Sequence, residues 1–277
     1  MGIENKNQIK EMKKKKILII GGNRFVGKKV AQTLFKEHNI TVLNRKGTSP
    51  VECNIIQQDR NKLKELPEYD IIIDMCLYNL EQTKNIVDIL KKQQNLQQYI
   101  FISSIASELE FFGKYGKQKL QAEKYLMLSR NKDLPWTILK PTYILGIDNP
   151  HDRESYYIKK ILNNEIIEVE GKGDQPLSFV FSEDIVKVIC KIIKEKTIHK
   201  TYNLCNDDVV TLKELITITS DVVGKTTNIQ YNSKGGPFKN KKCTFANDQV
   251  KNDLNIEFKP LKQGITDYYE WYKIPQS

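Results

Sequence analysis

The sequence lacks the features that define several protein classes. It has 5 cysteines and 3 histidines, all far apart, and no Cys-x-x-Cys pair. A disulfide framework and a zinc site therefore have no support, and we expect no bound metal. Apolar runs such as residues 71–73 are much shorter than the ~20 residues of a membrane-spanning helix, and no signal peptide is recognisable. A cytoplasmic protein without a membrane span is the simplest expectation.

Positive charge is the first feature that the sequence has in excess. Its 277 residues include 44 Lys and Arg against 34 Asp and Glu, a net charge of +10, and are 39% hydrophobic, as in a globular chain. The excess favours an anionic partner, either a small substrate or a nucleic acid, although scattered lysines also make an ordinary solvated surface. Residues 1–15 include most of a lysine run and are predicted to form a flexible basic N-terminus.

A strand, a glycine turn and a helix are predicted at the start of the chain. Residues 17–20 are a continuous apolar run, typical of a central parallel strand. The chain then reads Gly21-Gly22-Asn23-Arg24-Phe25-Val26-Gly27, and a helical pattern begins at Phe25. A pyrophosphate would meet free N–H groups and the positive end of the helix dipole there.

Each glycine of this stretch has an expected role. We expect Gly21 to make the tight turn, Gly22 to let the backbone approach a phosphate, and Gly27 to let the helix pack on the strand. The spacing departs from the usual Gly-x-Gly-x-x-Gly. A glycine turn without a nucleotide therefore stays open as the alternative.

The residues that end the second predicted strand bear on the choice of cofactor. A carboxylate there would bind the adenosine ribose 2′-hydroxyl and favour NAD. The chain instead has Asn44, Arg45 and Lys46, and an arginine is suited to a 2′-phosphate. Arg24 is expected to point toward the same region. We therefore favour NADP, with NAD as the other candidate, although these charges also fit an ordinary loop.

Short apolar strands alternate with helical segments through the first half of the chain. Strands are predicted at 54–56, 70–74 and 99–102, with a helix near 80–92. This order predicts an α/β fold, a Rossmann-type doubly wound parallel sheet with its ligands at the carboxyl ends of the strands. Candidates at those ends are Asp59, Arg60, Met75 and Cys76 for a cofactor and Tyr78 for a substrate. Asp59 is suited either to an adenine amino group or to capping a turn.

Tyr115 and Lys119 lie four positions apart, soon after the fifth predicted strand and Ser104. On a helix this spacing places both side chains on one face. A phenol has a pKa near 10, and a neighbouring ammonium favours its deprotonated form, so proton exchange with a substrate becomes feasible. Ser104 is suited to bind the substrate oxygen. The same spacing also occurs by chance on solvated helices.

At this point nearly the whole chain resembles the extended short-chain dehydrogenase/reductase superfamily, in its NAD-dependent epimerase/dehydratase group. The resemblance rests on the glycine stretch and on Ser103-Ser104, Tyr115-x-x-x-Lys119, Lys140-Pro141-Thr142-Tyr143-Ile144-Leu145-Gly146 and Phe179-Val180-Phe181-Ser182-Glu183-Asp184. It implies catalytic roles for Ser104, Tyr115 and Lys119 and a phosphate loop at residues 21–27. It also implies that Lys119 binds the nicotinamide ribose and that Pro141 lies against the nicotinamide. Tyr143 and Arg153 are substrate candidates.

Three departures from the family pattern narrow the expected function. Arg24 in the glycine loop resembles an atypical branch that includes chloroplast stem-loop RNA-binding proteins, and Ser104 and Tyr115 are only eleven positions apart. The arginine that often binds a nucleotide diphosphate is replaced by Leu177, although Arg153 or Lys172 could take its role. Ser104 is followed by Ile105 rather than by an acidic pair, which disfavours dehydration.

The expected function is hydride transfer at a carbinol or ketone of a sugar-type, nucleotide-activated and anionic substrate. Ketoreduction with dissociable NADP is favoured over epimerisation with a retained cofactor, and an RNA-binding protein without turnover is the alternative from another class. We expect a monomer or a homodimer. The predicted division is a dinucleotide-binding domain at 16–140 and a substrate-binding part at 141–277 that is not fully independent.

Overall fold

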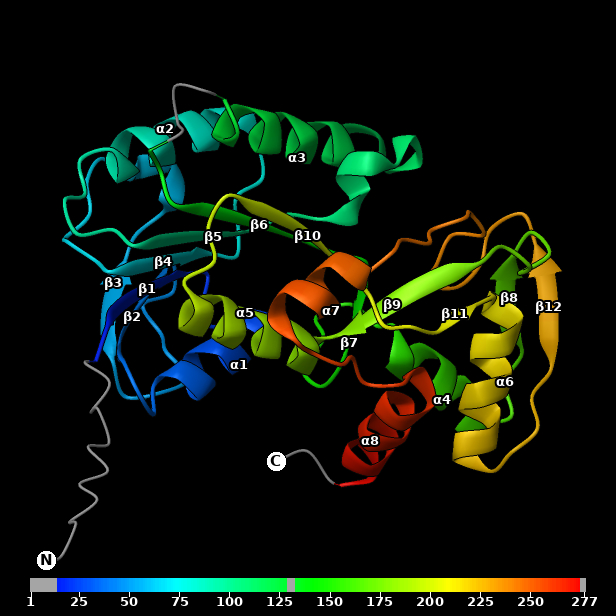
Figure 1. Cartoon of the computed structure of the whole chain (residues 1–277). Helices are drawn as coiled ribbons and strands as arrows, with labels where there is room; N and C mark the ends of the chain where they lie inside the picture. The colour runs from blue at the N-terminus through cyan, green and yellow to red at the C-terminus, as the bar shows by residue number, and fades with distance from the viewer. Residues whose placement is uncertain (1–13, 129–132, 275–277) are drawn as a thin grey trace, which may run out of the picture.

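The computed structural model describes residues 14–128 and 133–274 (Figure 1). Most of the predicted N-terminal segment therefore lies outside the described residues. Within them, seven strands form one sheet in the order β10-β6-β5-β4-β1-β2-β3, and every pairing in it is parallel. The strands are β1 Lys16–Ile20, β2 Asn39–Asn44, β3 Asn54–Gln57, β4 Ile71–Asp74, β5 Gln98–Ile102, β6 Trp136–Pro141 and β10 Lys200–Leu204. The predicted parallel α/β fold is confirmed.

Helices cover both faces of this sheet (Figure 1). On one face lie α1 Phe25–Leu34 and α5 Ser182–Glu195, which pack on each other, with α7 Asp248–Leu254 beside α5. On the other lie α2 Leu80–Leu90 and α3 Gly113–Leu126, which also contact each other. Short 3-10 helices follow β3 and β5: η1 Arg60–Lys62, η2 Ile105–Glu108 and η3 Glu110–Phe112.

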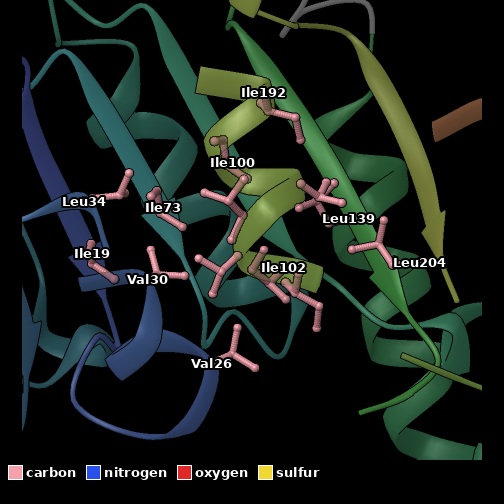
Figure 2. Packing of buried hydrophobic residues seen from close by; sticks show 14 of the residues in the cluster. Ile19, Val26, Val30, Leu34, Ile73, Ile100, Ile102, Leu139, Ile192 and Leu204 are labelled. Carbon is pink, nitrogen blue, oxygen red and sulfur yellow. The ribbon is translucent and has the colours of Figure 1, made fainter. Parts of the chain in front are cut away.

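The two sheet faces bury alternate residues of the same strands. Ile17 and Ile19 pack with Val30 of α1 and Ile192 of α5, while Leu18 packs toward α2 and α3. Figure 2 shows the first of these clusters, with side chains of β1, β4, β5 and β6 meeting those of α1 and α5. Because successive strand residues point to opposite faces, a strand covered on both sides must be apolar throughout. This is why the run at 17–20 was readable as a central strand.

A smaller part packs beyond the carboxyl ends of the central strands. It contains a three-stranded sheet of β7 Tyr143–Leu145, β9 Leu177–Phe181 and β11 Val209–Val210, and a pair of β8 Ile167–Glu170 with β12 Ile229–Asn232. Its helices are α4 Glu154–Leu162, α6 Leu212–Val223 and α8 Leu261–Lys273. Strand β10 and helix α5 come from the same half of the sequence but pack into the main core. The division at residue 140 therefore stays a prediction.

Two further properties concern the described residues as a whole. No helix among residues 14–128 and 133–274 combines the length and apolarity needed to cross a bilayer. In the same part of the chain, no three His, Cys, Asp or Glu side chains gather in a way that suits a metal ion.

Candidate active site

A cavity of about 580 Å³ opens at the carboxyl ends of the central strands. Thirteen of the candidate cofactor and substrate residues line it: Gly21, Asn23, Arg24, Phe25, Val26, Gly27, Asn44, Arg45, Asp59, Arg60, Met75, Cys76 and Tyr78. Lys46, Gln58, Asn61, Gln82, Ile102, Ile144 and Pro150 also contribute. Gly22, Ser104, Tyr115, Lys119, Pro141, Tyr143 and Arg153 do not appear in the lining. The cavity is therefore built mainly from the predicted dinucleotide residues.

The glycine loop has backbone geometry that side chains would obstruct. Gly21 has a φ of +88°, a left-handed conformation that glycine adopts without strain. A Cβ at Gly27 would lie 2.4 Å from the Gly21 carbonyl oxygen, so the start of α1 approaches the turn as closely as backbone atoms allow. A Cβ at Gly22 would instead meet the Ile19 side chain at 2.8 Å. Gly22 therefore has a packing role against β1, and its expected approach to a phosphate stays a prediction.

Exposed basic residues mark one end of the cavity, where β2 ends. Arg24 and Arg45 are both exposed and both line the cavity. Asn44 lies beneath them, and its side chain accepts from Lys46 N at 2.9 Å and donates to Thr48 O at 2.7 Å. Its amide thus shapes the loop that presents Arg45. We call this region the adenosine end, after the predicted ligand.

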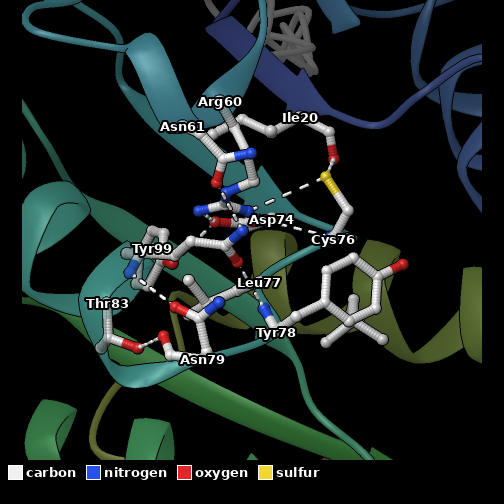
Figure 3. A network of polar contacts seen from close by, with 12 residues as sticks. Ile20, Arg60, Asn61, Asp74, Cys76, Leu77, Tyr78, Asn79, Thr83 and Tyr99 are labelled. Atoms are coloured by element: carbon white, nitrogen blue, oxygen red, sulfur yellow. Dashed lines mark hydrogen bonds and ion pairs between the residues drawn. The ribbon is translucent and has the colours of Figure 1, made fainter.

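Two acidic residues beside the cavity are already engaged by the protein. The Asp59 carboxylate accepts from Asn61 N at 2.9 Å and caps η1, which is the second of its two expected roles. The fully buried Asp74 carboxylate accepts hydrogen bonds from both terminal nitrogens of Arg60, at 2.6 and 2.9 Å (Figure 3). Arg60 lines the cavity, but those terminal donors are bonded to Asp74.

Lys119 stands at the opposite end, which we call the catalytic end. Its side chain is only 2% exposed, and its Nζ donates to Leu77 O at 2.7 Å and to Ile102 O at 3.1 Å. Its Nζ also lies 5.2 Å from the ring centroid of Tyr78, which lines the cavity. Burial lowers the pKa of Lys119 to about 8, and the nearby Asp74 carboxylate opposes that shift. Lys119 therefore contacts two residues of the cavity lining, Tyr78 and Ile102, and its catalytic role stays a prediction.

Tyr115 and Ser104 meet beside this ammonium. The Lys119 Nζ lies 5.9 Å from the Tyr115 ring centroid. Burial raises the pKa of Tyr115, whereas a hydrogen bond with Ser104 lowers it. The Ser104 Oγ accepts from Ala106 N at 3.2 Å at the start of η2, so the backbone orients its hydroxyl. The structure thus brings together the three residues that the sequence assigned to catalysis.

Arg153 and Tyr143, the two other substrate candidates, lie next to the catalytic end. The Arg153 Nη1 donates to Ile144 O at 2.6 Å, and Ile144 lines the cavity. The Arg153 guanidinium carbon lies 5.4 Å from the Tyr143 ring centroid. Its charge also contributes to lowering the pKa of Tyr115. Tyr143 itself is buried and packs mainly in the core of the smaller part.

Sequence reasoning missed a group of bonded side chains that includes the buried charges Glu123 and Lys140. The Ser103 hydroxyl donates to Glu123, and the Lys140 Nζ lies 3.5 Å from the other carboxylate oxygen of Glu123. Lys140 also bonds Glu108 of η2. Glu123 follows Lys119 by four positions, a spacing that would have revealed the shared helix face. Asp74 was missed too, because it was counted as part of an apolar strand.

Comparisons with known proteins identify the family of this chain. Residues 17–205 match the NAD dependent epimerase/dehydratase family. In Arabidopsis thaliana, the chloroplast stem-loop binding protein of 41 kDa b is 25% identical over 92% of this chain and 78% of its own. In Escherichia coli O157:H7, N-acetyl-alpha-D-glucosaminyl-diphospho-ditrans,octacis-undecaprenol 4-epimerase is 26% identical over 72% of this chain and 70% of its own.

A solved structure extends the similarity to the fold. The UDP-glucuronic acid 4-epimerase from Bacillus cereus, crystallised with UDP-glucuronic acid and NAD, matches with a TM-score of 0.78 and 16% identity. The match covers 93% of this chain and 99% of that one. At this identity the match concerns the fold, including the smaller part beyond the central sheet.

Proposed function

The chain belongs to the NAD-dependent epimerase/dehydratase family, and from that premise we propose that it interconverts a carbinol and a ketone on a nucleotide-activated sugar. The observation that carries this proposal is the meeting of Ser104, Tyr115 and Lys119 beside Tyr78, a residue that lines the cavity. Three side chains able to bind an oxygen and exchange its proton are what such chemistry needs from a protein. The remaining requirement is a hydride carrier.

The cavity fits a nicotinamide dinucleotide. Its loop has no room for a Cβ at Gly27, its turn at Gly21 is left-handed, and α1 begins directly behind them. The loop N–H groups and the helix dipole would hold the pyrophosphate. Lys119 would bind the nicotinamide ribose, and the chain at Pro141 would lie against the ring. A bound nicotinamide would supply the site for hydride exchange.

The side chains of the catalytic end supply the proton chemistry. Ser104 donates a hydrogen bond to the substrate oxygen, and Tyr115 exchanges a proton with that oxygen. Burial raises the pKa of Tyr115, so the phenol is protonated at neutral pH and is suited to donate when a ketone is reduced. The positive charges of Lys119 and Arg153 stabilise the phenolate that forms, which makes the reverse proton transfer accessible.

Epimerisation at a sugar carbon is the reaction that we propose first. The Escherichia coli relative and the Bacillus cereus structure are both named 4-epimerases. Ketoreduction, the reaction favoured from the sequence, receives no support over epimerisation from these comparisons. It stays as the second candidate because Arg24 and Arg45 at the adenosine end suit a dissociable NADP. The nucleotide sugar itself is a proposal that rests on these named relatives.

The experiment that tests this function starts from the purified protein and its retained ligand. We expect a nicotinamide dinucleotide to co-purify or to bind, and UDP-sugars to be converted into their 4-epimers. Oxidised cofactor retained through turnover supports epimerisation, whereas stoichiometric consumption of NADPH supports ketoreduction. Salt-sensitive RNA binding without any bound dinucleotide would overturn the enzyme proposal and favour the role that the Arabidopsis relative's name describes.

A further inference from the structure

The Asp74 carboxylate at the end of β4 is the centre of a buried polar network (Figure 3). Besides both terminal nitrogens of Arg60, it accepts from Tyr99 Oη at 3.1 Å and from Cys76 N at 3.1 Å. Asp74 is 0% exposed, and the Arg60 side chain is 9% exposed. A carboxylate this deeply buried is tolerated only when charged and polar donors surround it.

The network fixes the short loop of residues 75–78 at both of its ends. At the first end, Cys76 N is bonded to Asp74. At the second, Tyr78 N donates to the Gln82 Oε1 at 2.8 Å, one turn into α2. Between them Leu77 is fully buried, and its carbonyl accepts from the Lys119 Nζ at 2.7 Å. The loop that Asp74 holds therefore presents one of the two carbonyls that orient Lys119.

Asp74 also acts on Lys119 through its charge. Burial is the largest influence on the pKa of Lys119 and lowers it, and the Asp74 carboxylate is the largest charge that raises it. The other groups that face this ammonium are Cys76 and Glu123, which raise the pKa, and Arg60, which lowers it. The rings of Tyr78, Phe101 and Tyr115 complete its surroundings.

We propose that Asp74, bound by Arg60, is the positioning residue that sets both the orientation and the charge of Lys119. The inference rests on the proposed function in one respect: the proposed function is what makes Lys119 a catalytic group. It assigns a role to Arg60 that differs from the expected contact with the cofactor: Arg60 neutralises Asp74 and sets how much of that carboxylate's charge acts on Lys119.

The test measures the titration of Lys119 directly. The full chain is labelled with lysine carrying ¹³C at Cε, and the Lys119 signal is the one missing from Lys119→Met. We expect its midpoint near pH 8 in the unaltered protein, following the pKa that burial imposes. In Arg60→Gln the unneutralised Asp74 makes Lys119 its counter-ion, so the midpoint rises. In Arg60→Gln/Asp74→Asn that charge is gone and the midpoint falls below the unaltered value, each shift being about half a unit or more.

Shifts of the Lys119 midpoint in opposite directions in the two variants distinguish a positioning role of Asp74 from a purely structural one. A structural pair would leave the Lys119 midpoint unchanged in both variants, or move it in one direction in both, and either result would overturn the proposal. If Arg60→Gln does not fold, because it leaves the buried Asp74 carboxylate without its cation, the double variant decides alone, and the absence of a fall is the contrary outcome. The matched control is Asp253→Asn, which removes a carboxylate that likewise accepts from a tyrosine and a cation, Tyr202 Oη at 2.9 Å and Lys200 Nζ at 3.0 Å.

The same measurement stays informative if the proposed function fails. The titration needs neither cofactor nor substrate, so an enzyme without turnover still reports the Lys119 midpoint. Persistence of turnover in Tyr115→Phe would refute the proposed chemistry and leave the titration result standing. Unchanged midpoints beside an inactive Tyr115→Phe would refute the Asp74 inference and leave the proposed chemistry standing.

Discussion

The two ends of the cavity carry charge in opposite ways. At the adenosine end, Arg24 and Arg45 are exposed and lie on loops. At the catalytic end, Lys119 and Asp74 are almost completely buried, and both make hydrogen bonds to neighbouring backbone atoms. The exposed charges act in water, where their energies are small until a ligand covers them. Water screens the buried charges much less, and burial lowers the pKa of Lys119 to about 8.

This difference assigns different tasks to the two ends. Side chains that water surrounds can select between related ligands without affecting the fold. Side chains such as Lys119, whose pKa burial lowers to about 8, set proton chemistry and also contribute to whether the chain folds. We therefore expect substitutions at the adenosine end to change binding alone, and substitutions at the catalytic end to change turnover.

The largest expected effect is at the catalytic end, in Tyr115→Phe. The substitution keeps the ring beside Lys119 and removes the proton-exchanging hydroxyl, so the catalytic rate should fall by roughly 10²–10⁴-fold. Cofactor affinity, measured by fluorescence titration, should stay nearly unchanged because Tyr115 does not line the cavity. The matched control is Tyr231→Phe, since Tyr231 is an exposed phenol on β12. Equal activity of the two variants would contradict the assignment of proton chemistry to the catalytic end.

The next effect is at the adenosine end, in Arg45→Ala. If Arg45 binds a 2′-phosphate, its removal should weaken NADPH binding by roughly ten- to a hundred-fold, the loss of a charge-assisted hydrogen bond worth about 1.5–3 kcal/mol. NADH affinity should change little, and the catalytic rate at saturating cofactor should be retained. Isothermal titration with both cofactors checks this. A loss of the same size for both cofactors would contradict the NADP preference.

A smaller effect should appear in the pH dependence of Arg153→Met. The Arg153 charge lowers the pKa of Tyr115, so its removal disfavours the phenolate and raises that pKa. In the direction of carbinol oxidation Tyr115 must be deprotonated, and the rising limb of the catalytic rate should therefore move to higher pH, by up to about one unit. Arg45→Ala should leave the limb in place. A limb that moves to lower pH in Arg153→Met would contradict this assignment.

The fold was predictable because its signals are local and repeated. An apolar run such as 17–20, covered on both faces, can only be a buried strand, and its alternation with helices restricts the sheet to a parallel one. The return of β10 to the edge of the main sheet was not readable in that way. Its pairing with β6 joins residues about sixty positions apart, Lys200 with Thr137, and no local pattern encodes such a contact.

The site was predictable where one residue type has one chemical use. Tyr115, Lys119 and Ser104 follow from spacing after a strand, and the structure brings them together. The partners of charged residues were not predictable. Arg60 reads equally well as a cofactor contact or as the partner of a buried acid, and the structure was needed to show that it pairs with Asp74. Gly22 likewise needed the position of Ile19 before its role in packing was clear.

The smallest expected effects concern two ion pairs on α1, and they test whether solvent exposure alone determines how strongly two opposite charges stabilise each other. Helix α1 makes two ion pairs with later parts of the chain: Lys28 with Asp148 at 2.5 Å and Lys29 with Glu183 at 2.6 Å. The side chains of the first pair are 37% and 39% exposed, against 19% and 33% in the second.

Double-mutant cycles by urea denaturation should give a coupling of about 0.2–1 kcal/mol for the first pair, falling as salt is added. The second pair should couple more strongly and depend less on salt, because water screens it less. A reversed order would show that loop geometry, rather than exposure, governs these charges, and the contrast between the two ends of the cavity would then need the same explanation.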